Sequence, residues 1–258
     1  MVSDSPDKNG YVGTSESLAE SNLVRSDETQ LTTELVARDC VLIRNALTFA
    51  EQSRLCEYIE QSDRTPKDQP RAMVPTPKTL LLGEDAEGMP TPQIRYAFGD
   101  DTVINAMVDK SVSILKEQKL NVFCSSSSEL LETHGRQNPL ETHDVCQYNS
   151  LVMATIRYEA PNGCFPPHVD HCNDSFVCLA SLGRTANFMV KGPGPLDTQR
   201  HFPFNSGGVL LFDASSRASV LHSVVSIEKS ASKVGEALAN KFPVLNQHRY
   251  GVQCRMFF

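Results

Sequence analysis

The second half of the chain is a regular series of short apolar segments separated by turn residues. From Asn149 onward these segments are SLVMATIRY, SFVCLASLG, ANFMVKG, GGVLLFDA, VLHSVVSI and YGVQCRMFF. Short strands at regular spacing, with glycine and proline between them, are typical of an all-β sandwich or barrel. A long polar stretch, residues 228–247, interrupts the last two strands and indicates an inserted loop or a short helix.

Two helix patterns precede this β-rich half. Residues 41–43 (Val-Leu-Ile) indicate a short strand, and the following segment has apolar residues in helical spacing, with Thr48 as a possible N-cap and Glu51 three residues later. A second helix is predicted over residues 104–118, with one apolar face formed by Ile104, Met107, Val108, Val112 and Leu115. The sequence therefore predicts an α+β protein.

Composition narrows the class of protein. The net charge of −7 is concentrated at the start, because residues 1–35 hold seven acidic side chains against Lys8 and Arg25. We expect a disordered acidic tail over residues 1–35 and one domain over residues 36–258. The domain is nearly neutral, which does not favour extensive non-specific binding to phosphates. The eight cysteines include no CxxC pair, so a zinc cluster is not predicted.

No apolar run approaches the roughly 18 residues that a membrane helix needs, and the polar N-terminus lacks the apolar region of a signal peptide. We therefore expect a protein of the nucleus or the cytoplasm with no membrane segment. We also expect it to be a monomer.

The segment FPPHVDHCND, residues 165–174, contains a possible pair of metal ligands, His168 and Asp170. The prolines before this pair and Asn173-Asp174 after it are also typical of a surface turn. His222 lies in a strand-like segment 52 positions after Asp170. Two histidines and one carboxylate form the facial triad that binds Fe(II), and residues i and i+2 share a strand face while a strand distant in sequence brings the third ligand from the opposite side. The alternative for His222 is a buried histidine satisfied by a core hydrogen bond.

The last strand has two arginines on one face. A period of two places Arg249, Gly251, Gln253 and Arg255 together, and Tyr250, Val252, Cys254 and Met256 on the other face. The two arginines are six residues apart, or roughly 20 Å at about 3.3 Å per residue. Their guanidinium groups could close on a short dicarboxylate, with Gly251 making room. The alternative is two surface arginines on an edge strand.

The order of these motifs along the chain resembles that of the AlkB family of Fe(II)- and 2-oxoglutarate-dependent oxygenases. The segments that carry the resemblance are PPHVDHCND, CLASLG, GGVLLFDASSRASVLHSV and RYGVQCR, whose arginines have the family's spacing. YNSLVMATIRY resembles the strand before the metal pair, and PTPKTLLLGED followed by IRYAFGDD resembles the substrate lid. The resemblance runs from about residue 38 to the C-terminus.

The resemblance implies a double-stranded β-helix (jelly-roll) core with supporting N-terminal helices. His168, Asp170 and His222 would hold Fe(II). Arg249 would pair with the distal carboxylate of 2-oxoglutarate, and Tyr158 would hydrogen-bond to it. Arg255 would lie nearer the metal, where cosubstrate, Asp170 and substrate are all possible partners. With O2 as the second cosubstrate, the implied reaction is oxidative demethylation or hydroxylation.

The chain departs from the family pattern in the residues that shape the pockets. Cys172 takes the place of an acidic residue that meets the alkylated base, and Asp174 follows two positions later. Other departures are at Ile156, Ser223, Gly251 and Gln253.

Three functions stay open. The first is demethylation of a methylated base in nucleic acid, with Tyr96 or Phe98 stacking on a flipped base. The second is the same chemistry on a protein side chain or a small metabolite. The third is a non-catalytic binding module.

Overall fold

The computed structural model describes residues 30–64, 93–98, 102–135, 150–170 and 175–257. A compact unit spans Leu31–Phe258. The first half contains β1 (Thr32–Ala37), β2 (Cys40–Arg44), α1 (Phe49–Arg64), β3 (Gln93–Phe98), α3 (Thr102–Glu117) and α4 (Ser125–Thr133). The second half contains β4 (Ser150–Glu159), β5 (Phe165–Val169), β6 (Ser175–Gly183), β7 (Ala186–Lys191), β8 (Arg200–Phe204), β9 (Val209–Asp213), β10 (Leu221–Ile227), α6 (Lys233–Lys241), the 3-10 helix η4 (Pro243–Asn246) and β11 (His248–Phe257).

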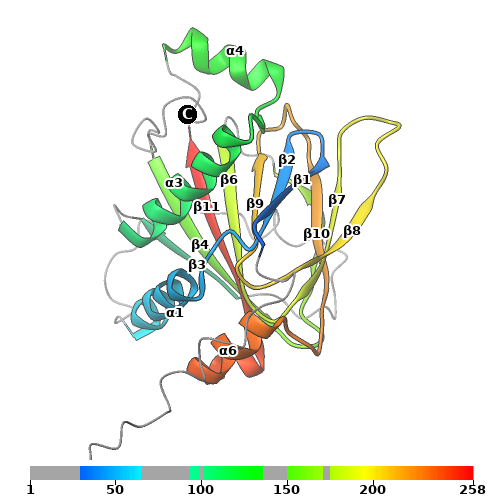
Figure 1. Ribbon diagram of the computed structural model, residues 1–258. Helices are drawn as coiled ribbons and strands as arrows, with labels where there is room; N and C mark the ends of the chain where they lie inside the picture. The colour runs from blue at the N-terminus through cyan, green and yellow to red at the C-terminus, as the bar shows by residue number, and fades with distance from the viewer. Residues whose placement is uncertain (1–29, 65–92, 99–101, 136–149, 171–174, 258) are drawn as a thin grey trace, which may run out of the picture. The chain divides into compact units, whose positions relative to one another are not determined.

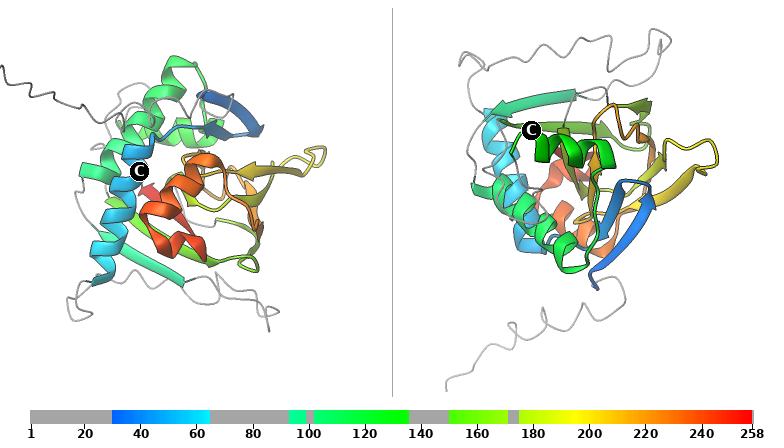
Figure 2. Two further views of the ribbon diagram at one scale, coloured as in Figure 1. Left: turned by 60° about the horizontal axis from the view of Figure 1, so that its bottom comes forward. Right: turned by 90° about the horizontal axis from the view of Figure 1, so that it is seen from above.

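The strands form two antiparallel sheets (Figure 1). The large sheet has seven strands in the order β1-β2-β9-β6-β11-β4-β3, and the small sheet has four in the order β5-β10-β7-β8. In the views of Figures 1 and 2, α1 and α3 lie on the side of the large sheet away from the small sheet. The six strands that the sequence predicts after Asn149 are all present, and β5 and β8 are additional.

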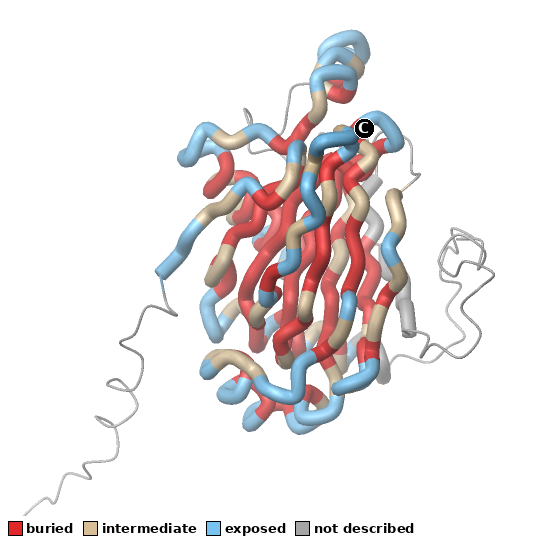
Figure 3. The backbone as a smooth tube through the Cα atoms, turned by 90° about the vertical axis from the view of Figure 1, so that its right-hand side faces the viewer, coloured by how far each residue is buried: buried red, intermediate tan, exposed pale blue. Residues whose placement is uncertain are grey.

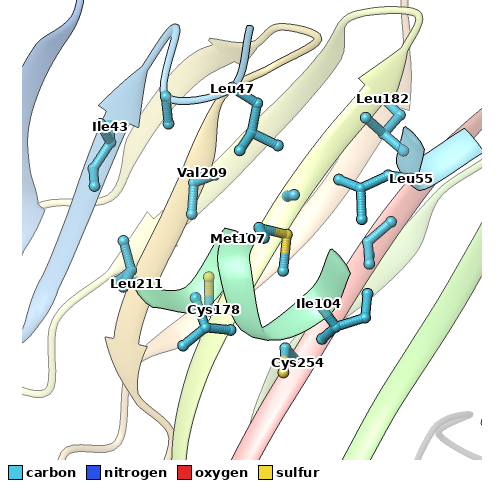
Figure 4. Close-up of a cluster of buried hydrophobic side chains, with 14 of the residues drawn as sticks. Ile43, Leu47, Leu55, Ile104, Met107, Cys178, Leu182, Val209, Leu211 and Cys254 are labelled. Carbon is cyan, nitrogen blue, oxygen red and sulfur yellow. The ribbon is translucent and has the colours of Figure 1, made fainter. Parts of the chain in front are cut away.

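Successive side chains on a strand of the large sheet point to opposite faces, so each face of the sheet carries its own layer of apolar side chains. On β6, for example, Cys178 and Ala180 face the helices, whereas Val177 and Leu179 face the small sheet. Figure 4 shows the first layer, where Leu55 of α1 and Met107 of α3 meet side chains of the large sheet. Figure 3 shows that the central strands are buried along most of their length. The second layer, between the sheets, is where the candidate site lies.

Both predicted helices are present, but α3 (Thr102–Glu117) begins two residues before the predicted range 104–118 and ends one residue before the end of that range. Thr48 and Glu51 form a capping box at the start of α1, because the Thr48 amide donates to Glu51 Oε2 at 2.7 Å and the Glu51 amide donates to Thr48 Oγ1 at 3.3 Å. All five residues of the apolar face predicted for the second helix are buried in α3. Within the described part of the chain, no helix is both long and apolar enough to cross a membrane.

Several elements differ from the prediction. Strand β1 begins at Thr32, so residues 32–35, which the sequence placed in the acidic tail, belong to the domain. Glu34 accepts hydrogen bonds from Arg44 and Arg200, which explains why an acidic residue lies in this strand. Part of the segment expected in the substrate lid forms β3, at the edge of the large sheet. Residues 75–85 and Cys172 and Asp174 lie outside the described residues.

The polar stretch before the last strand closes one end of the two sheets. It forms α6 and η4, whose Leu238 and Leu245 are fully buried. Lys241 donates to Glu57 at 2.9 Å, which joins α6 to α1, and the left view of Figure 2 shows these helices side by side. This is the end of β11 that carries Arg249, because β11 follows η4 directly and Arg249 pairs with Gly183.

Candidate metal centre

His168 and His222 are direct partners across two strands of the small sheet. In the pairing of β10 with β5, His222 lies opposite His168 and Leu221 lies opposite Val169. The two imidazole ring centroids are therefore only 4.2 Å apart. The sequence predicted the third ligand from a strand on the opposite side, and this was wrong, because β10 is the neighbour of β5 in the same sheet.

Asp170 completes the group, one residue after the end of β5. Asp170 Oδ1 lies 3.9 Å from His168 Nε2, and Asp170 Oδ2 lies 3.9 Å from His222 Nε2. One ligand atom from each of the three residues can be chosen so that all lie within 4.8 Å of one another. Separations of this size let one metal ion contact all three, so the structure brings the predicted triad together.

Backbone carbonyls fix which ring nitrogen of each histidine faces the site. His168 Nδ1 is 2.9 Å from the carbonyl oxygen of Pro166, and His222 Nδ1 is 3.0 Å from that of Val220. A carbonyl oxygen can only accept, so each Nδ1 carries the proton and donates it. In a neutral imidazole this leaves the Nε2 lone pair for a metal.

Burial and neighbouring charges set the protonation states. Burial, together with the nearby His222, lowers the pKa of His168 to about 4. Burial alone would raise the pKa of Asp170, but the Arg255 guanidinium and the two imidazoles lower it below its ordinary value. At neutral pH His168 is therefore neutral and Asp170 is ionised. Metal ligands must be deprotonated in this way.

Arg255 contacts the candidate metal ligand Asp170. Its Nη2 lies 2.8 Å from Asp170 Oδ2, and both side chains are only 13% exposed. Asp170 is one of the three partners that the sequence left open for Arg255. Arg255 is thus near the metal end of β11, as expected.

Arg249 lies at the other end of the same face and has a different environment. It is 1% exposed, its Nη2 donates to Ser181 Oγ at 3.1 Å, and its Nε has no hydrogen-bond partner among the described residues. Its guanidinium carbon lies 5.4 Å from the ring centre of Tyr158 and 5.3 Å from that of Phe204. Burial lowers the pKa of Arg249 to about 10, so it is still charged at neutral pH.

Tyr158 lies beside Arg249, because the two residues are paired across β4 and β11. It is 4% exposed, and burial raises the pKa of its phenol to about 12. The phenol is therefore protonated at neutral pH and can donate a hydrogen bond. The structure brings Tyr158 and Arg249 together, as predicted.

Two contributors were not singled out from the sequence as functional. Ser181 holds the guanidinium of Arg249, and Phe204 of β8 lies against it. CLASLG contains Ser181, but its alternation alone does not show what the serine meets. The side chains of Tyr96 and Phe98, which the sequence offered for base stacking, lie outside the described residues.

Comparisons with known proteins identify the fold. No family model matches the sequence, and no curated protein matches it. The solved structure of OsALKBH1 superposes with a TM-score of 0.53 at 17% identity, covering 84% of this chain and 97% of that one. A prolyl-4-hydroxylase from Pseudomonas putida gives a TM-score of 0.45 at 11% identity, covering 86% and 94% of the two chains. The likeness to OsALKBH1 shows the fold: this α+β chain is a jelly roll, as the resemblance to the AlkB family implied.

Proposed function

We propose that the protein is an Fe(II)- and 2-oxoglutarate-dependent dioxygenase that performs oxidative demethylation or hydroxylation. One observation carries the proposal. A two-histidine, one-carboxylate cluster, in which His222 is buried and His168 and Asp170 are partly buried, lies in the same interior layer of a jelly roll as a buried arginine, Arg249, with no acidic partner among the described residues. The first feature fits a metal ion and the second fits an anion.

The triad fits Fe(II) in its donor types. Two imidazoles and one carboxylate are the ligand set of non-haem Fe(II) oxygenases, and they leave coordination positions open for other ligands. His168, Asp170 and His222 would hold the ion. The bound iron supplies the chemistry in which O2 and 2-oxoglutarate are converted to succinate and carbon dioxide while a C–H bond is oxidised.

Arg249 fits the distal carboxylate of 2-oxoglutarate. A buried guanidinium without a counter-charge is costly, and a carboxylate ligand would offset this cost. The protonated phenol of Tyr158 would donate a second hydrogen bond to the same carboxylate. Arg255 would act on Asp170 rather than on the cosubstrate, since it lies 2.8 Å from that ligand.

Aromatic side chains around the histidines would keep water out of the site. The ring centres of Phe165 and His168 are 4.5 Å apart, and those of Phe212 and His222 are 4.8 Å apart. These rings belong to the apolar layer between the sheets. They orient the imidazoles and limit the access of water to reactive species.

For the substrate we propose an alkylated base in DNA or RNA. The support is the order of the sequence motifs, which resembles that of the AlkB family. Hydroxylation of an N-methyl group gives formaldehyde and the demethylated nitrogen. The same residues would perform this chemistry on a protein side chain or a small metabolite, and the experiment below includes that outcome.

The experiment measures succinate and formaldehyde after incubation with Fe(II), 2-oxoglutarate and either methylated oligonucleotides or methylated peptides. We expect formaldehyde with the oligonucleotides, and no turnover by the His168→Ala or Asp170→Ala variant. Formaldehyde released only from the methylated peptides would show that the substrate is a protein side chain rather than a nucleic-acid base. Failure of the wild type to bind Fe(II) under anaerobic conditions would exclude both enzymatic functions and leave a binding module.

A further inference from the structure

Gly251 is a glycine in the middle of a central strand. It pairs with Ile156 of β4 on one side and with Ser181 of β6 on the other. Both registers continue through it without a shift, so no β-bulge accounts for the residue. Glycine weakens the interior of a strand, and there it often marks a place where a ligand approaches closely.

The backbone does not require glycine at this position. Gly251 is not among the glycines with positive φ, which in the described chain are Gly135, Gly183 and Gly207. A methyl group on Gly251 would lie 3.5 Å from Leu179 Cδ1, 3.6 Å from Tyr158 Cε2 and 3.7 Å from Arg249 Nη1. These are ordinary van der Waals separations, so the fold accommodates an alanine without strain.

The space left by the missing methyl group lies against the candidate anion-binding residues. Two of its three nearest neighbours are Arg249 and Tyr158. Ser181 occupies one terminal nitrogen of Arg249, Nη2, while Nη1 faces the space. A carboxylate placed there would contact Nη1 of a guanidinium whose Nε also has no partner among the described residues.

We propose that Gly251 is a specificity-determining residue that keeps open the position of the distal carboxylate of the keto diacid. The inference rests on the proposed function, because it assigns the place of 2-oxoglutarate within that site. According to this inference, ligand binding requires a glycine at position 251, whereas the stability of the fold does not. A Gly251→Ala variant should therefore be at least as stable as the wild type and yet bind the keto acid more weakly.

The test compares Gly251→Ala with the wild type by thermal unfolding and by calorimetric titration with 2-oxoglutarate in the presence of Mn(II). We expect an equal or higher Tm without ligand, and affinity for 2-oxoglutarate reduced between about tenfold and about 200-fold, the range for one methyl-sized misfit. Cys254→Ala is the matched control, since Cys254 lies on the same strand but faces the helices. It should lower the Tm and leave the affinity unchanged.

Oxaloacetate, which is one carbon shorter, tests where the methyl group acts. Its distal carboxylate extends less far toward Arg249, so Gly251→Ala should weaken its binding less than that of 2-oxoglutarate. An equal loss for both acids would overturn the assignment of Gly251 to the distal carboxylate.

The remaining outcomes separate this inference from the proposed function. Unchanged affinity in Gly251→Ala, with the wild type binding 2-oxoglutarate, would overturn the inference and leave the proposed function intact. A markedly lower Tm would show that the fold needs the glycine, which also overturns the inference. No binding of 2-oxoglutarate by the wild type would count against the proposed function itself.

Discussion

Arg255 Nη2 lies 2.8 Å from Asp170 Oδ2, so one of the two arginines on β11 contacts a candidate metal ligand. Arg249, six residues earlier on the same strand face, has no ion pair with a carboxylate in the part of the chain that the structure describes. The two arginines therefore have different partners. Arg255 contacts a candidate metal ligand, and in the proposed function Arg249 would bind an anion from outside the chain.

Replacing Arg255 should weaken metal binding. In Arg255→Met the Asp170 carboxylate loses the cation that orients it, and losses of this kind typically reduce metal affinity about 10-fold to 100-fold. The measurement is a titration with Mn(II), followed by electron paramagnetic resonance. Arg255→Lys is the control, because it keeps the positive charge, and it should lose less. Equal Mn(II) affinity in Arg255→Met and the wild type would contradict the role given to this arginine.

Replacing Arg249 should have opposite effects on stability and on ligand binding. In Arg249→Met the ligand carboxylate loses its buried partner, which costs about 2–5 kcal/mol, or roughly 30-fold to several thousandfold in affinity for 2-oxoglutarate. Stability without ligand should stay equal or rise, because a buried charge without a counter-charge is removed. Calorimetric titration and urea unfolding measure the two effects. A variant that binds 2-oxoglutarate as tightly as the wild type would place the carboxylate elsewhere.

The local parts of the fold could be predicted from the sequence. The capping box of α1 and the buried face of α3 depend on residues a few positions apart, so spacing is enough to find them. The two faces of β11 follow from the period of two, and both faces are as predicted. His168 and Asp170 were paired from their spacing only together with His222 and the two arginines of the last strand, because the spacing alone also fitted a surface turn.

The non-local parts could not be predicted in this way. That β10 lies beside β5 is a matter of strand order, which periodicity does not encode. The first part of β1, residues 32–35, was assigned to the tail because of the polar, acidic composition of the N-terminal segment, and the arginines that neutralise Glu34 are 10 and 166 positions away. Helix α4 lacks a sequence signal at its start, since its N-cap, Cys124, makes no capping hydrogen bond through its side chain.

Glu51 should make stability depend on pH. Burial alone would raise its pKa, but hydrogen bonds from Lys110 and Thr48 outweigh burial and lower the pKa below the ordinary 4.5. The folded state therefore binds this proton less readily than the unfolded state. The stabilisation is present above pH 4.5 and is lost as the pH falls through the lower folded value.

Glu51→Gln tests this dependence. At pH 7 it should lower stability by roughly 0.2–1 kcal/mol, a small value because the ion pair with Lys110 is partly exposed to screening solvent. Urea unfolding at pH 7 and pH 3 should show the difference from the wild type shrinking in acid. Glu57→Gln removes the more exposed pair with Lys241 and serves as the control, with a smaller effect at pH 7. A difference that grows as the pH falls would reverse the assigned sign.

Gly183 provides the structural counterpart to Gly251. It ends β6 with φ of +89°, and a methyl group there would lie 3.0 Å from Leu245 Cδ2 of η4. Gly183→Ala should therefore destabilise the fold by about 1–3 kcal/mol, the usual cost of a side chain in a sparsely populated backbone conformation. Gly251→Ala should leave stability unchanged or raise it by up to about 1 kcal/mol. Urea unfolding of both variants in the absence of ligand measures the contrast. Equal destabilisation of the two would mean that the strand needs glycine at both positions, and that the space beside Arg249 is a requirement of the fold rather than of a ligand.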